Sequence, residues 1–283
     1  MKNVLIKSPI VSVNWLAQNQ NAPNMVIVDA SIPKVISENI EFDGLSKNQI
    51  KNARFIDLKN AFSDSSSEFP NTMLTPDHFA MTARDLGISN HNAIVVYDEF
   101  GIYSSPRAWW MFKAMGHDNI AVLDGGLPEW EKSGYLTEKK VLFSGNKGDF
   151  NANYNNFFFN NYQEVFEVIT NKSAVIIDAR SEERFKGLIE EPREGLRSGH
   201  IPTSVNMPYS KLVENNKMIN PKKISQIFSK IVNEEKRLIF SCGSGITACI
   251  LALGAEIIDL KNKSVYDGSW TEWGSKLELP IEK

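Results

Sequence analysis

A cysteine in a glycine-rich loop is the residue of this chain best suited to chemistry. Cys242 begins the run Cys-Gly-Ser-Gly-Ile-Thr, which follows a strand-like apolar run ending at Phe240 and precedes an almost continuously apolar stretch. Glycines in such a loop permit left-handed turns, so that backbone N–H groups point inward at the start of a helix. A cysteine at the root of the loop would sit in a positive field that favours its thiolate. We therefore predict that Cys242 is a nucleophile and not an inert cysteine at a strand end.

The same loop argues against phosphate chemistry. A cysteine-dependent phosphatase needs an arginine six residues after its cysteine to clamp the phosphate, and Ala248 stands at that position. The run 241–248 contains no Arg or Lys. We expect instead a small substrate that is held partly by groups outside the loop.

Four arginines after another candidate strand could supply those groups. They follow Asp178 in a segment that also contains several glutamates, and they are Arg180, Arg184, Arg193 and Arg197. Guanidinium groups bind carboxylates bidentately, whereas the alternative is a solvated basic surface that offsets glutamates such as Glu191. For Arg197 we favour the solvated surface. For Arg180 a structural ion pair and a substrate contact are equally open.

Two further residues have both a chemical and a structural interpretation. His200, the only histidine of the second half, could act as a general base for Cys242. The Ile-Pro that follows it, and Gln49 at the equivalent place in the first half, favour a structural role. Cys249 belongs to an apolar helical stretch, so we expect it in the core and consider a redox partnership with Cys242 the less favoured alternative.

The elements that would position these residues occur twice. Residues 26–30 (VIVDA) resemble residues 175–179 (VIIDA), the strand before Asp98 resembles the one before Cys242, and 124–130 (DGGLPEW) resembles 267–273 (DGSWTEW). Three matches in one order, at nearly constant spacing, indicate a duplicated domain. Because Asp98 replaces the cysteine in the first half, we expect one active site per chain, in the second half.

Alternation of apolar β-branched runs with helical stretches predicts the fold of each half. We expect an α/β protein of two tandem domains, each a mostly parallel central sheet flanked by helices. Ligands of such sheets lie outside the carboxyl ends of the strands, where Cys242 and the arginines fall. An intervening segment rich in Asn and Gly has linker chemistry. We assign residues 1–140 to a non-catalytic domain, 141–161 to an Asn-rich linker and 162–283 to the catalytic domain.

Composition excludes several classes of protein. The chain has 283 residues, 42% hydrophobic and 23% charged, with a net charge of −3, which is unlike a disordered, collagen-like or coiled-coil chain. The charge argues against nucleic-acid and polybasic membrane binding. Two cysteines exclude a disulfide scaffold and a multi-cysteine zinc module. Without an 18-residue apolar run or a secretory leader, a reducing cytoplasm is the expected compartment.

The whole pattern resembles the tandem-domain rhodanese superfamily of sulfurtransferases. The resemblance runs from Val26 to Trp273 and includes residues 105–110 (SPRAWW) and 199–202 (GHIP). Family members that use thiosulfate typically carry two basic residues directly after the cysteine, whereas those that use 3-mercaptopyruvate carry Gly-Ser, as at Gly243 and Ser244 here. The resemblance therefore implies two rhodanese-like domains and an enzyme that takes sulfur from 3-mercaptopyruvate.

The resemblance also implies roles for individual residues. Cys242 would accept sulfur as a persulfide, pyruvate would be released, and the sulfur would pass to a thiol acceptor (thioredoxin or a low-molecular-weight thiol) or to cyanide. The residues implied to bind the substrate are Arg184, Arg193, Gly243, Ser244, Gly245, Ile246 and Thr247. No metal, organic cofactor, nucleic acid or membrane is implied. Thiosulfate as the sulfur donor, or a non-catalytic persulfide carrier, are the alternatives.

One feature of the family has no clear counterpart. The family serine is often linked to an aspartate and a histidine from the first domain. Near the expected histidine this chain has Pro70-Asn71-Thr72-Met73, and no aspartate partner is evident. A proton relay through Ser244 and a simple hydrogen bond from its hydroxyl therefore both stay open.

Overall fold

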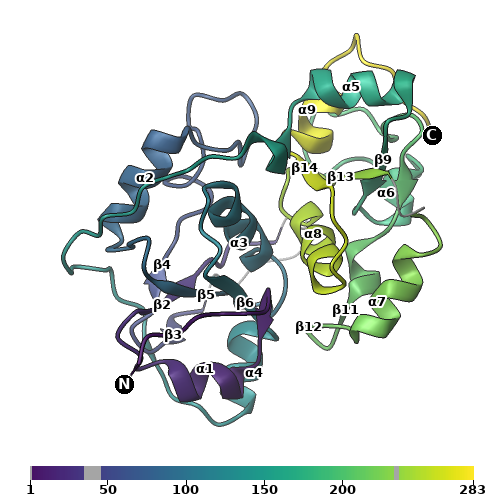
Figure 1. The fold of residues 1–283 in the computed structure, drawn as a ribbon. Helices are drawn as coiled ribbons and strands as arrows, with labels where there is room; N and C mark the ends of the chain where they lie inside the picture. Colours follow the sequence, from purple (N-terminus) through teal and green to yellow (C-terminus); the bar gives the residue numbers. More distant parts are fainter. Residues whose placement is uncertain (1, 35–45, 233–235) are drawn as a thin grey trace.

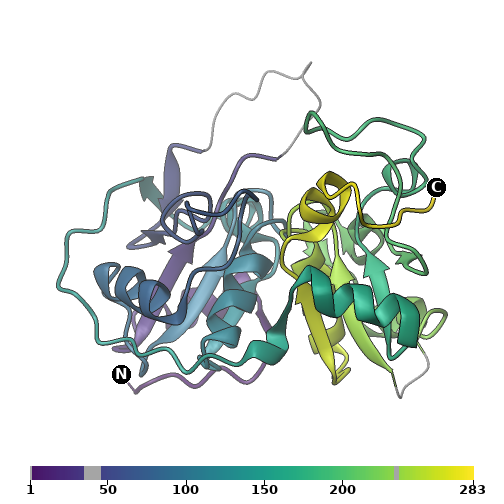
Figure 2. The same ribbon diagram turned by 90° about the horizontal axis from the view of Figure 1, so that it is seen from above.

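Two sheets, one from each half of the chain, lie side by side (Figure 1, Figure 2). The computed structural model describes residues 2–34, 46–232 and 236–283. Each sheet is parallel throughout and carries helices on both faces, as the sequence predicts for a tandem α/β protein. No helix in the described ranges is long and apolar enough to cross a membrane.

The first sheet has the strand order β1-β6-β5-β2-β4. Its strands are β1 (Ile10–Val11), β2 (Met25–Asp29), β4 (Arg54–Phe55), β5 (Ala93–Tyr97) and β6 (Ile120–Leu123). The helices of this half are α1 (Val13–Asn19), α2 (Pro76–Asp85), α3 (Ser105–Ala114) and α4 (Gly126–Lys132). A separate antiparallel pair is formed by β3 (Asn48–Ile50) and β7 (Thr137–Lys139).

The second sheet has the order β10-β9-β13-β14-β8. Read from its opposite edge, the first sheet has the order β4-β2-β5-β6-β1, and each strand then occupies the place of its counterpart in the second sheet. Its strands are β8 (Phe159–Asn160), β9 (Ala174–Asp178), β10 (Val205–Asn206), β13 (Arg237–Ser241) and β14 (Lys263–Tyr266). Its α-helices are α5 (Tyr162–Asn171), α6 (Glu182–Phe185), α7 (Pro221–Phe228), α8 (Ala248–Ile257) and α9 (Ser269–Ser275). The short elements are the 3-10 turns η1 (Asn156–Phe158) and η2 (Tyr209–Leu212) and the antiparallel pair β11 (Val213–Glu214) and β12 (Lys217–Met218). The shared strand order confirms the duplication inferred from the sequence.

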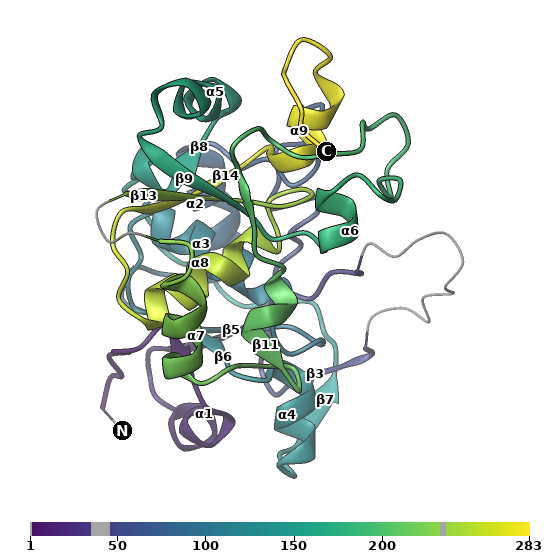
Figure 3. The ribbon, with the colours of Figure 1, turned by 90° about the vertical axis from the view of Figure 1, so that its right-hand side faces the viewer.

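The central strands are apolar along their length because both faces of each sheet are covered. Helices α5 and α9 lie on one face of the second sheet and α7 and α8 on the other (Figure 3). Side chains along β13 therefore point alternately to the two faces of the sheet. Ile239 packs with apolar residues of α5 and α9, whereas Leu238 and Phe240 pack with apolar residues of α7 and α8. The strand ends at Ser241, which places Cys242 directly at the carboxyl edge of the sheet.

The two halves share one apolar interior. Helix α3 of the first half contacts α8 of the second (Figure 1), and a single cluster of buried side chains includes Trp110 of α3 and Leu251 of α8. The segment before β8 is also fastened to the first half: Phe150 is fully buried against Phe79 and Phe112. An extensive apolar contact of this kind holds the two halves in a fixed relation.

Candidate active site

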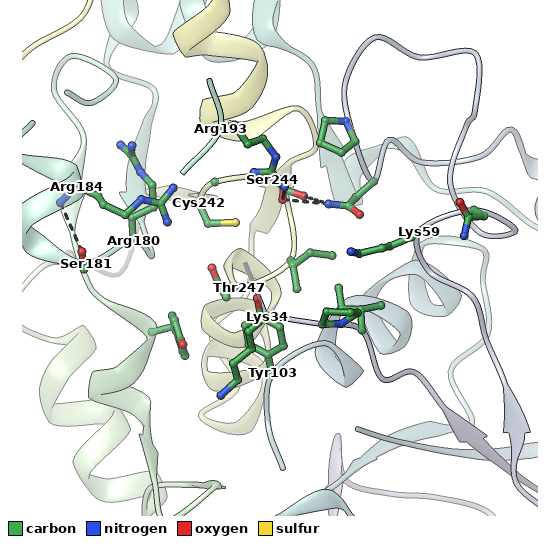
Figure 4. A pocket seen from close by; sticks show the side chains of 18 residues that line it. Lys34, Lys59, Tyr103, Arg180, Ser181, Arg184, Arg193, Cys242, Ser244 and Thr247 are labelled. Atoms are coloured by element: carbon green, nitrogen blue, oxygen red, sulfur yellow. Dashed lines mark hydrogen bonds between the residues drawn. The ribbon is translucent and has the colours of Figure 1, made fainter. Parts of the chain in front are cut away.

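Cys242 lines a cavity of about 650 Å³ whose walls come from both halves (Figure 4). Its side chain is 1% exposed and points into that cavity. The first half contributes Ile32, Pro33, Lys34, Lys59, Asn60, Pro70, Asn71 and Tyr103. The second half contributes Arg180, Ser181, Arg184, Arg193, Tyr209, Cys242, Gly243, Ser244, Ile246 and Thr247. All the predicted site residues except Gly245 are thus brought together.

The loop after Cys242 is held by its carbonyl groups. The Cys242 carbonyl accepts a hydrogen bond from the Trp270 N–H (3.0 Å), and the Gly243 carbonyl accepts from the N–H (2.8 Å) and the hydroxyl (2.6 Å) of Thr271. Within the described ranges, the N–H groups of residues 243–248 donate no hydrogen bond. A row of unused N–H groups at the start of a helix is available to an anion.

The first half shows what such a cradle binds. There the carboxylate of Asp98 accepts hydrogen bonds of 2.8–3.0 Å from the N–H groups of Phe100, Tyr103, Ser104 and Ser105. It also accepts one from the Ser105 hydroxyl (2.6 Å). Asp98 therefore fills its own cradle with a negative charge, so these N–H groups are not available to an anionic ligand.

Two arginines on the second-half wall differ in how their charge is used. The Arg184 guanidinium donates to both carboxylate oxygens of Glu191, at 3.2 and 2.5 Å. The Arg193 guanidinium makes only long contacts to the hydroxyls of Thr271 (3.5 Å) and Ser244 (3.4 Å), and pairs with no carboxylate of the described residues. Burial lowers the pKa of Arg193, while the nearby Cys242 thiol acts in the opposite direction. Arg193 stays protonated and is the arginine of this wall whose charge no carboxylate of the described residues neutralises.

Arg180 forms a structural ion pair, which is one of the two roles that its sequence position allows. Its guanidinium binds the carboxylate of Asp178 (2.7 Å), the carboxylate of Glu191 (2.8 Å) and the Gly199 carbonyl (2.8 Å). It also lies over the Trp270 ring at 4.4 Å. Glu191, expected on a solvated surface, is instead buried between Arg180 and Arg184.

The expectation that Arg197 belongs to a solvated surface is wrong. Its guanidinium donates to backbone carbonyls at the end of α9, including those of Trp273 (2.9 Å) and Gly274 (3.0 Å), and to the Leu279 carbonyl (2.9 Å). Carbonyls at a helix C-terminus lack partners within the helix, and a cation satisfies them. The physical reason is thus capping, which a charge count along the sequence does not reveal.

Ser244 is contacted from the first half by Asn71. The Asn71 amide donates to the Ser244 hydroxyl oxygen (3.0 Å) and to the Ser244 carbonyl (3.1 Å). An amide cannot take up a proton at neutral pH, so no relay runs through this contact. In the sequence, Asn71 is visible only as a departure from the family pattern, and nothing there indicates its contact with Ser244.

A second contact between the halves supports the loop from behind. The Arg107 guanidinium binds the Asp267 carboxylate (2.7 Å), the Asn71 carbonyl (2.7 Å) and the Gly245 carbonyl (3.4 Å). Gly245 adopts a left-handed conformation (φ +76°) with its carbonyl directed at Arg107, which explains why it does not line the cavity. Both motifs that contain Arg107 and Asp267 are visible in the sequence, but nothing in one sequence pairs them.

His200 and Cys249 have the structural roles that the sequence favours. The His200 ring stacks on Phe185 at 3.8 Å, and its Nδ1 lies 2.8 Å from the Phe185 carbonyl. Cys249 is fully buried, and burial raises the pKa of its thiol to about 12. Neither residue lines the cavity, so neither takes part in chemistry there.

Comparison with known proteins gives matches over nearly the whole chain. The rhodanese-like domain family matches residues 12–133 and 161–276. A 3-mercaptopyruvate sulfurtransferase of Escherichia coli strain K12 is 36% identical over 275 residues, which is 96% of this chain and 97% of that protein. The mitochondrial thiosulfate/3-mercaptopyruvate sulfurtransferase 1 of Arabidopsis thaliana is 34% identical over 302 residues (99% and 79%).

The fold comparison agrees with the sequence matches. The crystal structure of the 3-mercaptopyruvate sulfurtransferase SseA from Escherichia coli superposes with a TM-score of 0.82 at 33% identity. The superposition covers 93% of this chain and 99% of SseA. The similarity therefore includes both halves and the arrangement between them.

Proposed function

The chain belongs to the rhodanese-like family and is a sulfurtransferase, and from this premise we propose that it transfers sulfur from 3-mercaptopyruvate through a persulfide on Cys242. The observation that carries the proposal is the environment of Cys242. A buried thiol faces a cavity, beside a row of N–H donors and an arginine for which the described part of the chain provides no acceptor and no carboxylate partner, respectively. Such a place stabilises sulfur anions and binds an acidic donor.

The first half-reaction begins with the Cys242 thiolate. It attacks the sulfur of 3-mercaptopyruvate, the carbon–sulfur bond breaks, and the –SH group moves to the enzyme as Cys242–S–SH. The electron pair of the broken bond leaves as the enolate of pyruvate, which water then protonates. Arg193 binds the donor carboxylate, and Arg184, partly neutralised by Glu191, faces the carbonyl oxygen, where negative charge develops.

Ser244 contributes a hydrogen bond in this step. Its oxygen already accepts from Asn71 and Arg193, and a hydroxyl has two acceptor lone pairs and one hydrogen. Both lone pairs are then occupied, which leaves the O–H to donate to the substrate. Ser244 therefore acts as a donor and not as a base.

The persulfide is the intermediate that links the two half-reactions. In the corresponding cradle of the first half, the N–H groups bind the carboxylate of Asp98. By analogy, the N–H groups of residues 243–248 would bind the outer sulfur of the persulfide as an anion. A thiolate acceptor or cyanide then removes the outer sulfur and regenerates the Cys242 thiolate. Two separated steps on one nucleophile predict ping-pong kinetics.

Thiosulfate is the second candidate donor. The Arabidopsis relative carries both donors in its name, and the cavity contains lysines of the first half that a dianion could use. Against it, the loop of residues 241–248 lacks any basic residue next to the position of the attacked sulfur. We therefore place 3-mercaptopyruvate first.

Steady-state kinetics with each donor test the proposal. We expect kcat/KM to be at least tenfold higher for 3-mercaptopyruvate than for thiosulfate with dithiothreitol as acceptor, and mass spectrometry to find one added sulfur atom on Cys242. Cys242→Ser should abolish turnover, whereas Cys249→Ala, a matched control in a fully buried position away from the cavity, should retain it. A preference for thiosulfate, or activity in Cys242→Ser, would contradict the proposal.

A further inference from the structure

The cavity is larger than the proposed sulfur donor requires. Its volume of about 650 Å³ lies within the range that holds drug-sized ligands, whereas 3-mercaptopyruvate is a three-carbon acid. The groups proposed to hold this donor all belong to the second half. The wall contributed by the first half is therefore unassigned, although it belongs to the same cavity.

Two lysines occupy that unassigned wall. Lys59 points from the first half toward the centre of the cavity, and the Cys242 thiol points toward the centre from the opposite wall (Figure 4). The Lys34 ammonium lies 4.5 Å from the centre of the Phe100 ring and 5.3 Å from that of Tyr103. Contacts with aromatic rings hold a cation in place without neutralising its charge.

The charges of the cavity divide into two groups. On the second-half side, Asp178 and Glu191 neutralise Arg180 and part of Arg184, which leaves Arg193 for the carboxylate of the donor. On the first-half side, neither Lys34 nor Lys59 forms an ion pair with any residue that the structure describes, and no carboxylate lines the cavity. A donor with one carboxylate thus leaves two cations unused.

We propose that Lys34 and Lys59 form the subsite of the sulfur acceptor, and that the acceptor is a small thiol carrying one or more carboxylates. This inference rests on the proposed function, since it concerns the second half-reaction. The acceptor thiolate forms a bond to the outer sulfur of Cys242–S–SH, the bond between the two sulfurs breaks, and Cys242 leaves as the thiolate. The product is the acceptor persulfide R–S–SH, and no other reactant is consumed.

Burial of the nucleophile favours a small acceptor over a protein. Cys242 is 1% exposed, and the cavity in front of it is lined by residues of both halves. A small thiol can enter that space and place its carboxylates against the lysines while its sulfur reaches the persulfide. A cavity lined by one sign of charge also raises the local concentration of anions.

The test compares three small thiols of different charge as acceptors. They are mercaptosuccinate, which is a dianion at neutral pH, uncharged 2-mercaptoethanol and cationic cysteamine. The protein is first converted to the Cys242 persulfide with inorganic polysulfide, so that acceptor turnover is measured without any donor. Lys34→Gln, Lys59→Gln and the double variant are compared with Lys51→Gln, an exposed lysine of the same half outside the cavity.

We expect each cavity substitution to reduce the second-order rate constant for mercaptosuccinate by about fivefold, and the double substitution by about twentyfold. The rate constant for 2-mercaptoethanol should change less than twofold, that for cysteamine should rise, and Lys51→Gln should behave as wild type. Added KCl should slow mercaptosuccinate in the wild type and much less in the double variant. Equal losses for all three thiols, or no loss for mercaptosuccinate, would overturn the subsite.

Measuring the donor half-reaction separately distinguishes this inference from the proposed function. Single-turnover release of pyruvate from 3-mercaptopyruvate should be the same in the wild type, in Lys34→Gln, in Lys59→Gln and in the double variant. A selective loss of that step in the variants would assign the lysines to the donor and overturn the acceptor subsite. Absence of pyruvate release from the wild type would refute the donor, while the persulfide experiment would still decide on the acceptor.

Discussion

Arg193 and Arg184 show how two residues of one type acquire different functions from their neighbours. Glu191 already occupies two N–H groups of Arg184, whereas Arg193 has only two hydroxyl contacts of 3.4–3.5 Å. The charge of Arg193 is therefore available to a substrate, whereas Glu191 takes two of the five N–H groups of Arg184 and part of its charge. The two arginines of this wall therefore offer unequal charge to a substrate, because only Arg184 is paired with a carboxylate of the described residues.

This difference predicts unequal effects of two matched substitutions. Arg193→Lys keeps the charge but loses the planar fork that binds a carboxylate, and we expect kcat/KM for 3-mercaptopyruvate to fall by roughly ten- to a hundredfold. Arg184→Lys should cost several-fold less, because Glu191 competes for that group. Initial rates of pyruvate formation measure both. A larger loss in Arg184→Lys than in Arg193→Lys would show that Arg184, and not Arg193, binds the carboxylate.

The side chains that sequence reasoning found and those it missed differ in sequence distance. Cys242 and its loop were predictable because a strand, a glycine-rich turn and a helix are consecutive in the chain. Asn71, Arg107 and Lys59 were missed because they reach the loop from the other half of the molecule. A single sequence contains the residues of both halves but not their pairing across the interface.

At the scale of elements, the same strand–loop–helix unit occurs twice with different contents. In the unit of β13 and α8 the N–H groups are unused, and in that of β5 and α3 the carboxylate of Asp98 binds them. The duplication of this unit was readable from the repeated motifs, because each local pattern was retained. The role of Asp98 was only half readable: the sequence shows that it replaces the cysteine, but not that its carboxylate binds the N–H groups of its own loop.

The internal anion predicts a stability effect in the half without catalysis. Asp98→Ala would leave three buried and one partly buried N–H group and the Ser105 hydroxyl without their acceptor, and we expect the free energy of unfolding to fall by about 3–5 kcal/mol. Asp98→Asn should cost less, because an amide oxygen can still accept most of these bonds. Urea denaturation of the three proteins measures this order. Equal stabilities of Asp98→Ala and the wild type would refute the interpretation.

At the scale of the whole molecule, the half that contains no cysteine completes the cavity in front of Cys242. It supplies the wall that carries Lys59, the amide that orients Ser244, and the guanidinium of Arg107 that reaches the Gly245 carbonyl. Helices α3 and α8 meet in a common apolar interior, so the contacts between polar groups are held by packing around them. The cavity in front of Cys242 therefore depends on the first half, although that half contains no cysteine.

The Arg107–Asp267 pair is where this dependence can be measured. The Asp267 carboxylate accepts from Arg107 (2.7 Å) and from the Met73 N–H (2.8 Å), which joins two segments of the first half to the end of β14. Asp267→Asn leaves the guanidinium of Arg107, 1% exposed, without its countercharge. Removal of one partner from a buried pair is strongly destabilising, and we expect a loss of about 2–4 kcal/mol in unfolding free energy together with a lower kcat.

A matched exposed pair controls for the charge change itself. Asp118 also binds a lysine at 2.7 Å, but its side chain is 82% exposed, so Asp118→Asn should alter stability and kcat far less. The double variant Asp267→Asn/Arg107→Met removes the unpaired charge and should recover part of the stability, but not kcat, because the Gly245 carbonyl then lacks its support. Urea denaturation and pyruvate release separate the two effects. If Asp267→Asn and Asp118→Asn behaved alike, the catalytic loop would not depend on the first half through this pair.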